Sequence, residues 1–188
     1  MTDFNASYDG TPPWDIGRPQ PALAEMPLSG RVLDVGCGTG EHASLAASQG
    51  LEATGIDAAP KAIELARAKA ASRGLEVRFL LHDALDLGSL GEQFDTVMAC
   101  GLFHVFDDDD RARYVRSLSS VVPSGGRLFV LCFSENQPGD FGPRRVTQDE
   151  IRTSFADGWR VDAIDAVRMP ITILPDGIYA WRASLTRV

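Results

Sequence analysis

Short apolar runs alternate with longer amphipathic segments through the middle of the chain. The runs are rich in β-branched residues, which is typical of buried strands, and the segments between them carry apolar residues at helical spacing. This pattern predicts strands at residues 31–35, 52–57, 76–81, 94–99 and 127–133, with helices at about 40–49, 59–73 and 108–121. Alternating strands and helices predict right-handed crossovers and a parallel sheet that is covered on both faces.

The two ends of the chain follow other patterns. Residues 1–28 contain five prolines and no clear period, so we expect an irregular arm, ordered because its aromatic side chains need burial. Residues 135–146 are predicted to form a loop, and Thr147 with Glu150 has the spacing of a capping box that opens a helix at about 148–156. Two alternating segments near 158–168 and 177–187 then predict an antiparallel hairpin. We therefore expect one domain, with an arm (1–28), a core (29–134) and a C-terminal part (135–188).

The strand at 31–35 runs directly into a turn with glycines at 36, 38 and 40. A glycine turn before a helix lets a nucleotide-like ligand approach the backbone, because no Cβ atom stands in the way. The dinucleotide fingerprint Gly-x-Gly-x-x-Gly would need its third glycine at position 41, which is Glu41. This spacing argues against a nicotinamide-dependent oxidoreductase, which stays an alternative at this point.

The string Asp34-Val-Gly-Cys-Gly-Thr-Gly40 resembles motif I of the class I S-adenosylmethionine (SAM)-dependent methyltransferases. The resemblance covers residues 31–134. It implies a Rossmann-like α/β fold with seven strands in the order 3-2-1-4-5-7-6, mostly parallel and ending in an antiparallel pair. It also implies SAM as the cofactor, with its methionine part against the turn formed by Asp34, Gly36, Cys37, Gly38 and Gly40.

Further cofactor residues are expected where the other strands end, since ligands of such sheets bind beyond the carboxyl ends of the strands. Asp57 can accept the ribose hydroxyls with Ala58 beside the adenine, although Asp57 can also cap the next helix. Asp83 and Ala84 resemble the family's adenine-binding motif, but Asp83 is also a common turn residue. Cys100 would lie under the sulfonium, or would be a small buried hydrophobe.

The arm carries a second resemblance. Residues 12–20, Pro-Pro-Trp-Asp-Ile-Gly-Arg-Pro-Gln, resemble the N-terminal Trp-Asp segment of the thiopurine and halide/thiol methyltransferases, in which a tryptophan closes over cofactor and substrate. Trp14 would then shield the sulfonium by cation–π contact. Arg18 would pair with the SAM carboxylate or with Asp15. The alternative is that the arm is a hydrophobic plug.

Methyl transfer is an in-line displacement that needs a nucleophile held in a dry pocket. If a base is required, His104, which follows the fourth strand, is the best candidate. A structural histidine between Phe103 and Phe106 is the alternative. Tyr179 can also reach the pocket, although a hairpin core position would explain it as well.

Composition narrows the class of acceptor. The chain has 18 basic and 26 acidic residues, a net charge of −8, which disfavours a nucleic-acid partner. The sequence has no apolar run of the ~20 residues that a membrane span needs and no signal-peptide pattern, so we expect a cytoplasmic protein. Its three cysteines are widely spaced, so we expect no disulfide framework. The aspartates at 107–110 are expected to open a helix and not to bind a metal, because consecutive helical side chains diverge.

We therefore expect a SAM-dependent methyltransferase acting on a small molecule: a thiol, a halide, or the hydroxyl or nitrogen of an aromatic heterocycle. Detoxification or secondary metabolism would be its setting, and the protein would be a monomer or homodimer. A SAM-binding protein without catalytic activity is the remaining alternative.

Overall fold

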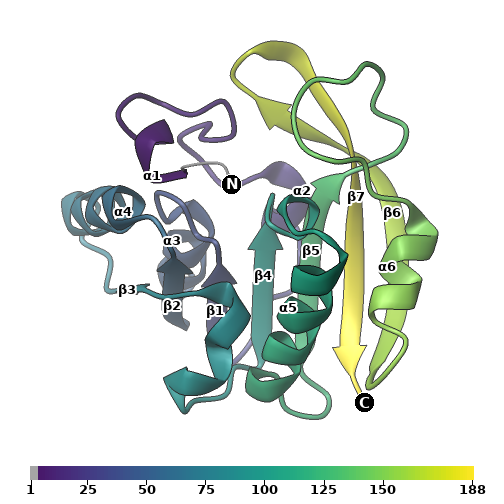
Figure 1. Ribbon diagram of the computed structural model, residues 1–188. Coiled ribbons are helices and arrows are strands. Elements are labelled where there is room, and N and C mark those ends of the chain that lie inside the picture. The colour runs from purple at the N-terminus through teal and green to yellow at the C-terminus, as the bar shows by residue number, and fades with distance from the viewer. Residues whose placement is uncertain (1–3) are drawn as a thin grey trace.

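Seven strands form a single sheet in the computed structural model, which describes residues 4–188 (Figure 1). Their order is β3-β2-β1-β4-β5-β7-β6, as expected. Neighbouring strands are parallel from β3 to β5, and β7 pairs antiparallel with both β5 and β6. The strands are β1 (Arg31–Val35), β2 (Glu52–Asp57), β3 (Arg78–Leu81), β4 (Thr96–Cys100), β5 (Arg127–Phe133), β6 (Trp159–Ile171) and β7 (Leu174–Arg187).

Helices cover both faces of this sheet. Alternate side chains of the central strands enter different cores: Val97 packs in one cluster with residues of α5 and α6, and Met98 packs in another with residues of α2 and α3. Burial on both faces explains why these strands are continuous apolar runs. The helices are α1 (Phe4–Ser7), α2 (Pro21–Ala24), α3 (Glu41–Ser48), α4 (Pro60–Ser72), α5 (Asp108–Val121) and α6 (Gln148–Ser154), with 3-10 turns η1 (Ala84–Leu90) and η2 (Phe103–Val105).

Local signals set several helix ends where the sequence predicts them. Asp107 caps α5 by accepting a hydrogen bond from the Asp110 N–H, and Thr147 and Glu150 form the capping box of α6. Pro60 lies in the first turn of α4. None of the helices within residues 4–188 is long and apolar enough to cross a membrane.

Three segments differ from the expectation. The arm contains two short helices, α1 and α2, and the loop predicted after β3 contains η1, which Asp83 caps through the Leu85 N–H. The C-terminal hairpin is longer than predicted at its tip, because β6 runs on to Ile171 and β7 begins at Leu174, where the two residues pair.

Candidate active site

The strand-end residues predicted to bind the cofactor come together along one edge of the sheet. β3, β2, β1 and β4 are neighbours and parallel, so their carboxyl ends form a row. The arm lies over this edge (Figure 1). The row consists of Asp83, Asp57, Asp34 with the glycine turn, and Cys100.

Two glycines of the turn have different tasks. Gly38 and Gly40 both adopt positive φ, 52° and 84°. A Cβ atom on Gly40 would lie 2.5 Å from the Phe79 ring, so this glycine permits close packing of α3 against β3. A Cβ atom on Gly38 would lie 3.0 Å from the Tyr8 hydroxyl, so Gly38 is where the arm closes on the turn.

Asp34 is buried with 0% exposure at the end of β1. Its Oδ2 accepts a hydrogen bond from the Ala43 N–H at 3.2 Å, whereas Oδ1 is buried without a hydrogen-bond partner among the described residues. Burial raises the pKa of Asp34 to about 7, and nearby Asp57 adds to the rise. An unpaired buried carboxylate oxygen is a natural receptor for a cationic hydrogen-bond donor.

Asp57 ties the glycine turn to the start of α4. Its Oδ2 accepts from the Gly38 N–H at 2.9 Å and its Oδ1 from the Ala59 N–H at 2.8 Å, while burial raises its pKa. Each oxygen has a second lone pair, so these bonds leave acceptor capacity for a ribose. Ala58 is exposed beside it. The helix-start role is therefore present, and ribose binding remains our prediction.

The two cysteines of the predicted site are placed differently. The Cys37 side chain packs into a core cluster with Ile63 and Phe79, and its thiol donates to the Gly38 carbonyl of the turn at 3.6 Å. Cys100 is partly buried, and burial raises the pKa of its thiol. Asp83 is exposed and caps η1, with the half-buried Ala84 next to it, so the turn role holds and the adenine role stays a prediction.

Aromatic side chains of the arm gather above the glycine turn. The Trp14 indole N–H donates to the Tyr8 hydroxyl at 3.3 Å, and Trp14 meets Phe4 and Tyr8 edge-on. Trp14 is 38% exposed, so it is no hydrophobic plug on its own. Asn5 accepts a hydrogen bond from the Lys61 N–H and thereby caps α4, whose own N-cap residue is an alanine.

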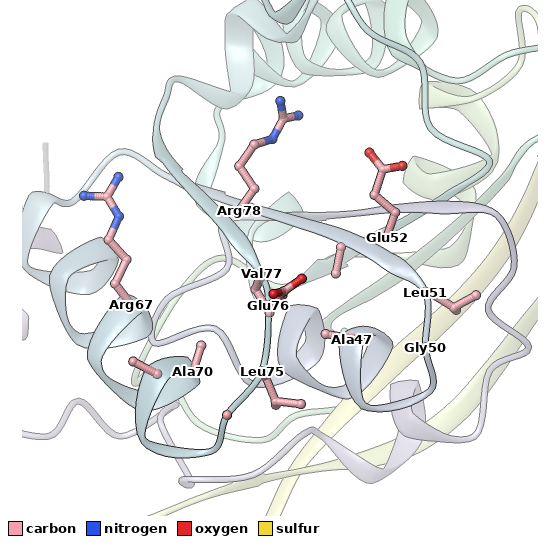
Figure 2. Close-up of a pocket in the computed structure, with 13 residues that line it drawn as sticks. Ala47, Gly50, Leu51, Glu52, Arg67, Ala70, Leu75, Glu76, Val77 and Arg78 are labelled. Atoms are coloured by element: carbon pink, nitrogen blue, oxygen red, sulfur yellow. The ribbon is translucent and has the colours of Figure 1, made fainter.

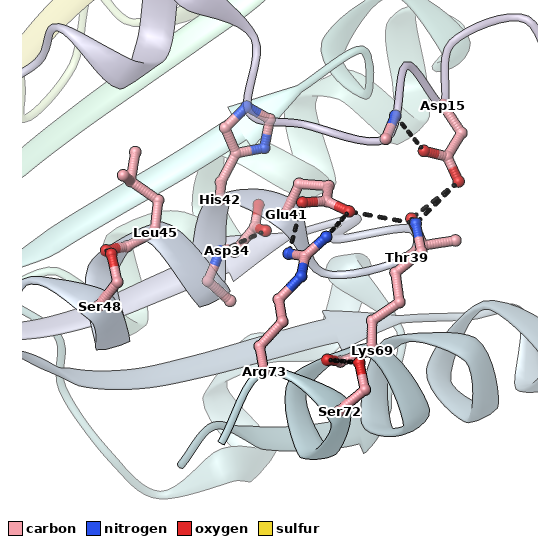
Figure 3. Close-up of polar contacts among 12 residues, drawn as sticks. Asp15, Asp34, Thr39, Glu41, His42, Leu45, Ser48, Lys69, Ser72 and Arg73 are labelled. Atoms are coloured by element: carbon pink, nitrogen blue, oxygen red, sulfur yellow. Dashed lines mark hydrogen bonds and ion pairs between the residues drawn. The ribbon is translucent and has the colours of Figure 1, made fainter. Parts of the chain in front are cut away.

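A polar network anchors the other end of the arm (Figure 3). Asp15 accepts from the Thr39 hydroxyl at 2.8 Å and lies 3.4 Å from the Lys69 ammonium. Asp15 is thus engaged by these two groups, and Arg18 is exposed. The pairing of Arg18 with the SAM carboxylate remains a prediction.

Glu41 is a member of this network that sequence reasoning did not assign. It accepts two hydrogen bonds from Arg73 and one from Lys69 (Figure 3). Burial would raise the pKa of Glu41, but these cationic partners lower it below its ordinary value. The residue that replaces the third fingerprint glycine therefore fastens α3 to α4.

His104 lies on η2, buried at the end of β4. Its Nδ1 accepts the Phe133 N–H at 3.0 Å, and burial, with Arg145 and Arg111 nearby, lowers its pKa to about 3. The ring is therefore neutral with its proton on Nε2. This arrangement favours a hydrogen-bond donor over a general base.

The loop before α6 forms a wall beside His104. Arg145, which the sequence did not single out, holds this loop by donating to four backbone carbonyls and lies over the rings of Phe133 and Phe141. The carbonyls belong to Gln137, Gly139, Phe141 and Pro143. Phe141 is thereby kept partly exposed at the carboxyl edge of the sheet.

Tyr179 lies where this loop meets the hairpin. Its N–H donates to Gln137 Oε1 at 2.8 Å, and the Arg168 guanidinium stands 3.5 Å above its ring. A hollow of about 270 Å³ opens beside these three residues. Tyr179 is 41% exposed, on β7 and two strands from β4, so it belongs to the rim and not to the hairpin core.

A larger cavity than this hollow lies elsewhere. It measures about 880 Å³ and opens between the C-terminal ends of α3 and α4 and the first residues of β2 and β3 (Figure 2). Ala47, Ala70 and Val77 are among the residues that line it. Because it adjoins the amino ends of the strands, it is at the opposite edge from the predicted site.

Comparison with known proteins identifies the class. A family model described as a methyltransferase domain matches residues 32–126. The chain is 35% identical over 181 residues to 2-heptyl-1-hydroxyquinolin-4(1H)-one methyltransferase of Mycobacteroides abscessus, which covers 88% of this chain and 80% of that protein. It is also 42% identical over 123 residues to demethylmenaquinone methyltransferase of Thermus thermophilus, covering 64% and 54% of the two chains.

A solved structure described as "Conversion of a Disulfide Bond into a Thioacetal Group during Echinomycin Biosynthesis" has the same fold. It superposes with a TM-score of 0.88 at 36% identity, covering 100% of this chain and 93% of that one. The chain belongs to the methyltransferase domain family.

It is a SAM-dependent methyltransferase, and the oxidoreductase alternative is set aside. The residues at the carboxyl edge fit SAM, because three of the five residues of the turn are glycines without a Cβ atom and the unpaired Asp34 oxygen can receive a cation.

Proposed function

We propose that this protein methylates an acidic hydroxyl or ring nitrogen of a flat, apolar heteroaromatic compound, in detoxification or secondary metabolism. A 1-hydroxyquinolin-4-one with an alkyl chain is the acceptor we favour. The 35% identity with a methyltransferase named for such a quinolone supports the choice.

The observation that carries this proposal is where apolar side chains are exposed. Within residues 4–188, most exposed large hydrophobic side chains lie at the carboxyl edge of the sheet, on the arm, the end of β3, the loop before α6 and the hairpin. They are Phe4, Trp14, Leu81, Phe141, Ile173 and Tyr179. Exposed apolar groups gathered at one edge suit an apolar acceptor, since its burial there removes both surfaces from water.

The chain's own residues position the reactants and exclude water. Bound SAM supplies an electrophilic methyl group on a sulfonium. Asp57 and the glycine turn would hold the cofactor, and the Trp14 segment would cover it. Neutral His104 would donate a hydrogen bond from Nε2 to an acceptor oxygen. An acidic N-hydroxyl reaches the site as an anion, so no protein base is needed.

A sulfur acceptor is the second candidate. The solved structure described for conversion of a disulfide into a thioacetal favours it, at 36% identity over the whole chain. A thiolate would likewise react as an anion.

The test is methyl transfer from labelled SAM to 2-heptyl-1-hydroxyquinolin-4(1H)-one, to the same compound without the N-hydroxyl, and to small thiols and iodide. We expect a labelled product with the N-hydroxy compound and a rate at least tenfold lower without the hydroxyl. If labelled product forms only with the thiols, the sulfur acceptor replaces the N-hydroxyl acceptor that we propose. Tight SAM binding without turnover on any of these would favour the non-catalytic alternative.

A further inference from the structure

Gln20, at the end of the arm, has a buried oxygen without a partner. The side chain is 2% exposed, and its Oε1 has no hydrogen-bond partner among the described residues. Its Nε2 donates to the Pro170 carbonyl at 3.0 Å. Because the NH₂ group is turned toward this carbonyl, Oε1 faces the other way.

Gln20 and Asp34 both reach the first turn of α3. The Gln20 N–H donates to His42 Nε2 at 3.1 Å, and the next residue, Ala43, donates its N–H to Asp34 Oδ2 at 3.2 Å. The Gln20 backbone and the Asp34 side chain thus contact adjacent residues of this turn, and each of the two residues has one unpaired, buried acceptor oxygen. Leaving two such acceptors unsatisfied is unfavourable, and a shared hydrogen-bond donor would remove that cost.

We propose that Gln20 Oε1 and Asp34 Oδ1 together bind the α-ammonium group of the cofactor's methionine part. An ammonium group is donor-only with three N–H bonds, which matches two acceptors that have no donor. The carboxylate of Asp34 supplies the opposite charge. This assignment makes Gln20 a cofactor-binding residue, and it is independent of which acceptor is methylated.

The same side chain connects cofactor binding with the hairpin. Gln20 is bonded to Pro170 in β6, and the neighbouring Thr172 N–H donates to the Pro13 carbonyl of the arm at 2.9 Å. An ammonium group on Oε1 would therefore hold the arm closed from the cofactor side while β6 holds it from the other.

The test compares three ligands that differ only in the groups on the methionine part. S-adenosylhomocysteine has both ammonium and carboxylate, its decarboxylated analogue has the ammonium alone, and 5′-methylthioadenosine has neither. Calorimetry on Gln20→Met should show that Kd is raised roughly tenfold for the first two ligands, because one hydrogen bond to a charged group is lost. The Kd for the third ligand should be unchanged. Gln93→Met, at an exposed glutamine, is the matched control and should leave all three Kd values unchanged.

Other outcomes contradict the assignment. An equal loss for all three ligands would mean that Gln20 only packs the arm. A loss of affinity confined to S-adenosylhomocysteine would mean that Gln20 recognises the carboxylate. Unchanged affinity for all three ligands would mean that Gln20 Oε1 is bonded to water and not to the cofactor. Thermal unfolding without ligand shows whether Gln20→Met folds. If it does not, Gln20→Asn is used instead, since it keeps the amide but is one methylene shorter and cannot reach the ammonium group. The same pattern across the three ligands is expected.

Discussion

Asp34 is a residue whose folded environment opposes its ionisation. Its pKa of about 7, against an ordinary 3.8, means that its contribution to folding stability is fully present below about pH 3.8 and is lost as pH rises through 7. Asp34→Asn has no such loss. We therefore predict that, without cofactor, the variant's melting temperature exceeds that of the wild type by more at pH 8 than at pH 5, as measured by thermal unfolding.

The same substitution should weaken SAM binding, because the amide carries no negative charge. If the difference in melting temperature between Asp34→Asn and the wild type does not grow with pH, Asp34 is not held protonated in the free protein.

Asp57→Ala should raise the Kd for SAM by more than about tenfold, since it removes the acceptor for the ribose and releases the Gly38 N–H. Calorimetry measures the Kd, and circular dichroism checks that the protein is folded. Unchanged affinity would remove the ribose assignment.

His104 yields a prediction about pH. With a pKa of about 3 it stays neutral throughout the neutral range, so His104 should contribute no acidic limb near pH 6.5 to kcat for a hydroxyl acceptor. The measurement is a rate profile from pH 5 to 8. A limb at 6.5 that disappears in His104→Gln would restore the base hypothesis.

At this scale, sequence reasoning found residues whose place follows from topology. Asp34 and Asp57 end neighbouring parallel strands, so they had to meet. Sequence reasoning did not assign Gln20, Glu41 and Arg145 to the site, because their partners are set by tertiary packing. Gln20, for example, bonds to Pro170, which is 150 positions away. No local pattern announces such contacts.

Among the elements, the part of the arm before α2 is fixed to the glycine turn and to α4 by polar contacts. Asp15 bonds to Thr39 in the turn, and Asn5 caps α4. We predict that Asp15→Ala speeds amide hydrogen exchange in residues 5–20 and leaves β4 and β5 protected, because the central strands do not depend on this contact. Saturating S-adenosylhomocysteine should restore part of the protection. Unchanged exchange in the arm would show that Asp15 does not anchor it.

The hairpin shows where an element-level prediction was incomplete. The predicted strands, near 158–168 and 177–187, stop short of Pro170 and begin after Pro175. The structure continues both strands through these residues. Pro170 lies in β6 at the edge of the sheet, and Pro175 lies in the part of β7 before Ala180, which does not pair with β5, so a missing N–H is tolerated at both positions. The periodic segments from β1 to β5 left no such ambiguity.

For the whole molecule, cofactor binding should appear as added stability, because the site exists only in the folded chain. Ligand at 100 times its Kd contributes about 2.7 kcal/mol. For a chain of this size that corresponds to a rise in melting temperature of roughly 5–10 °C. Thermal unfolding with S-adenosylhomocysteine measures it, with adenosine at equal concentration as the control. An equal rise with adenosine would mean that the methionine part contributes nothing.

The arm and the C-terminus lie at opposite edges of the sheet (Figure 1). The described chain begins beside the glycine turn, and Val188 is exposed at the amino ends of the strands. This geometry bears on how the protein is best handled: an affinity tag or fluorescent fusion joined before the arm would lie near the predicted cofactor site, whereas the same fusion after Val188 would lie at the opposite edge of the sheet.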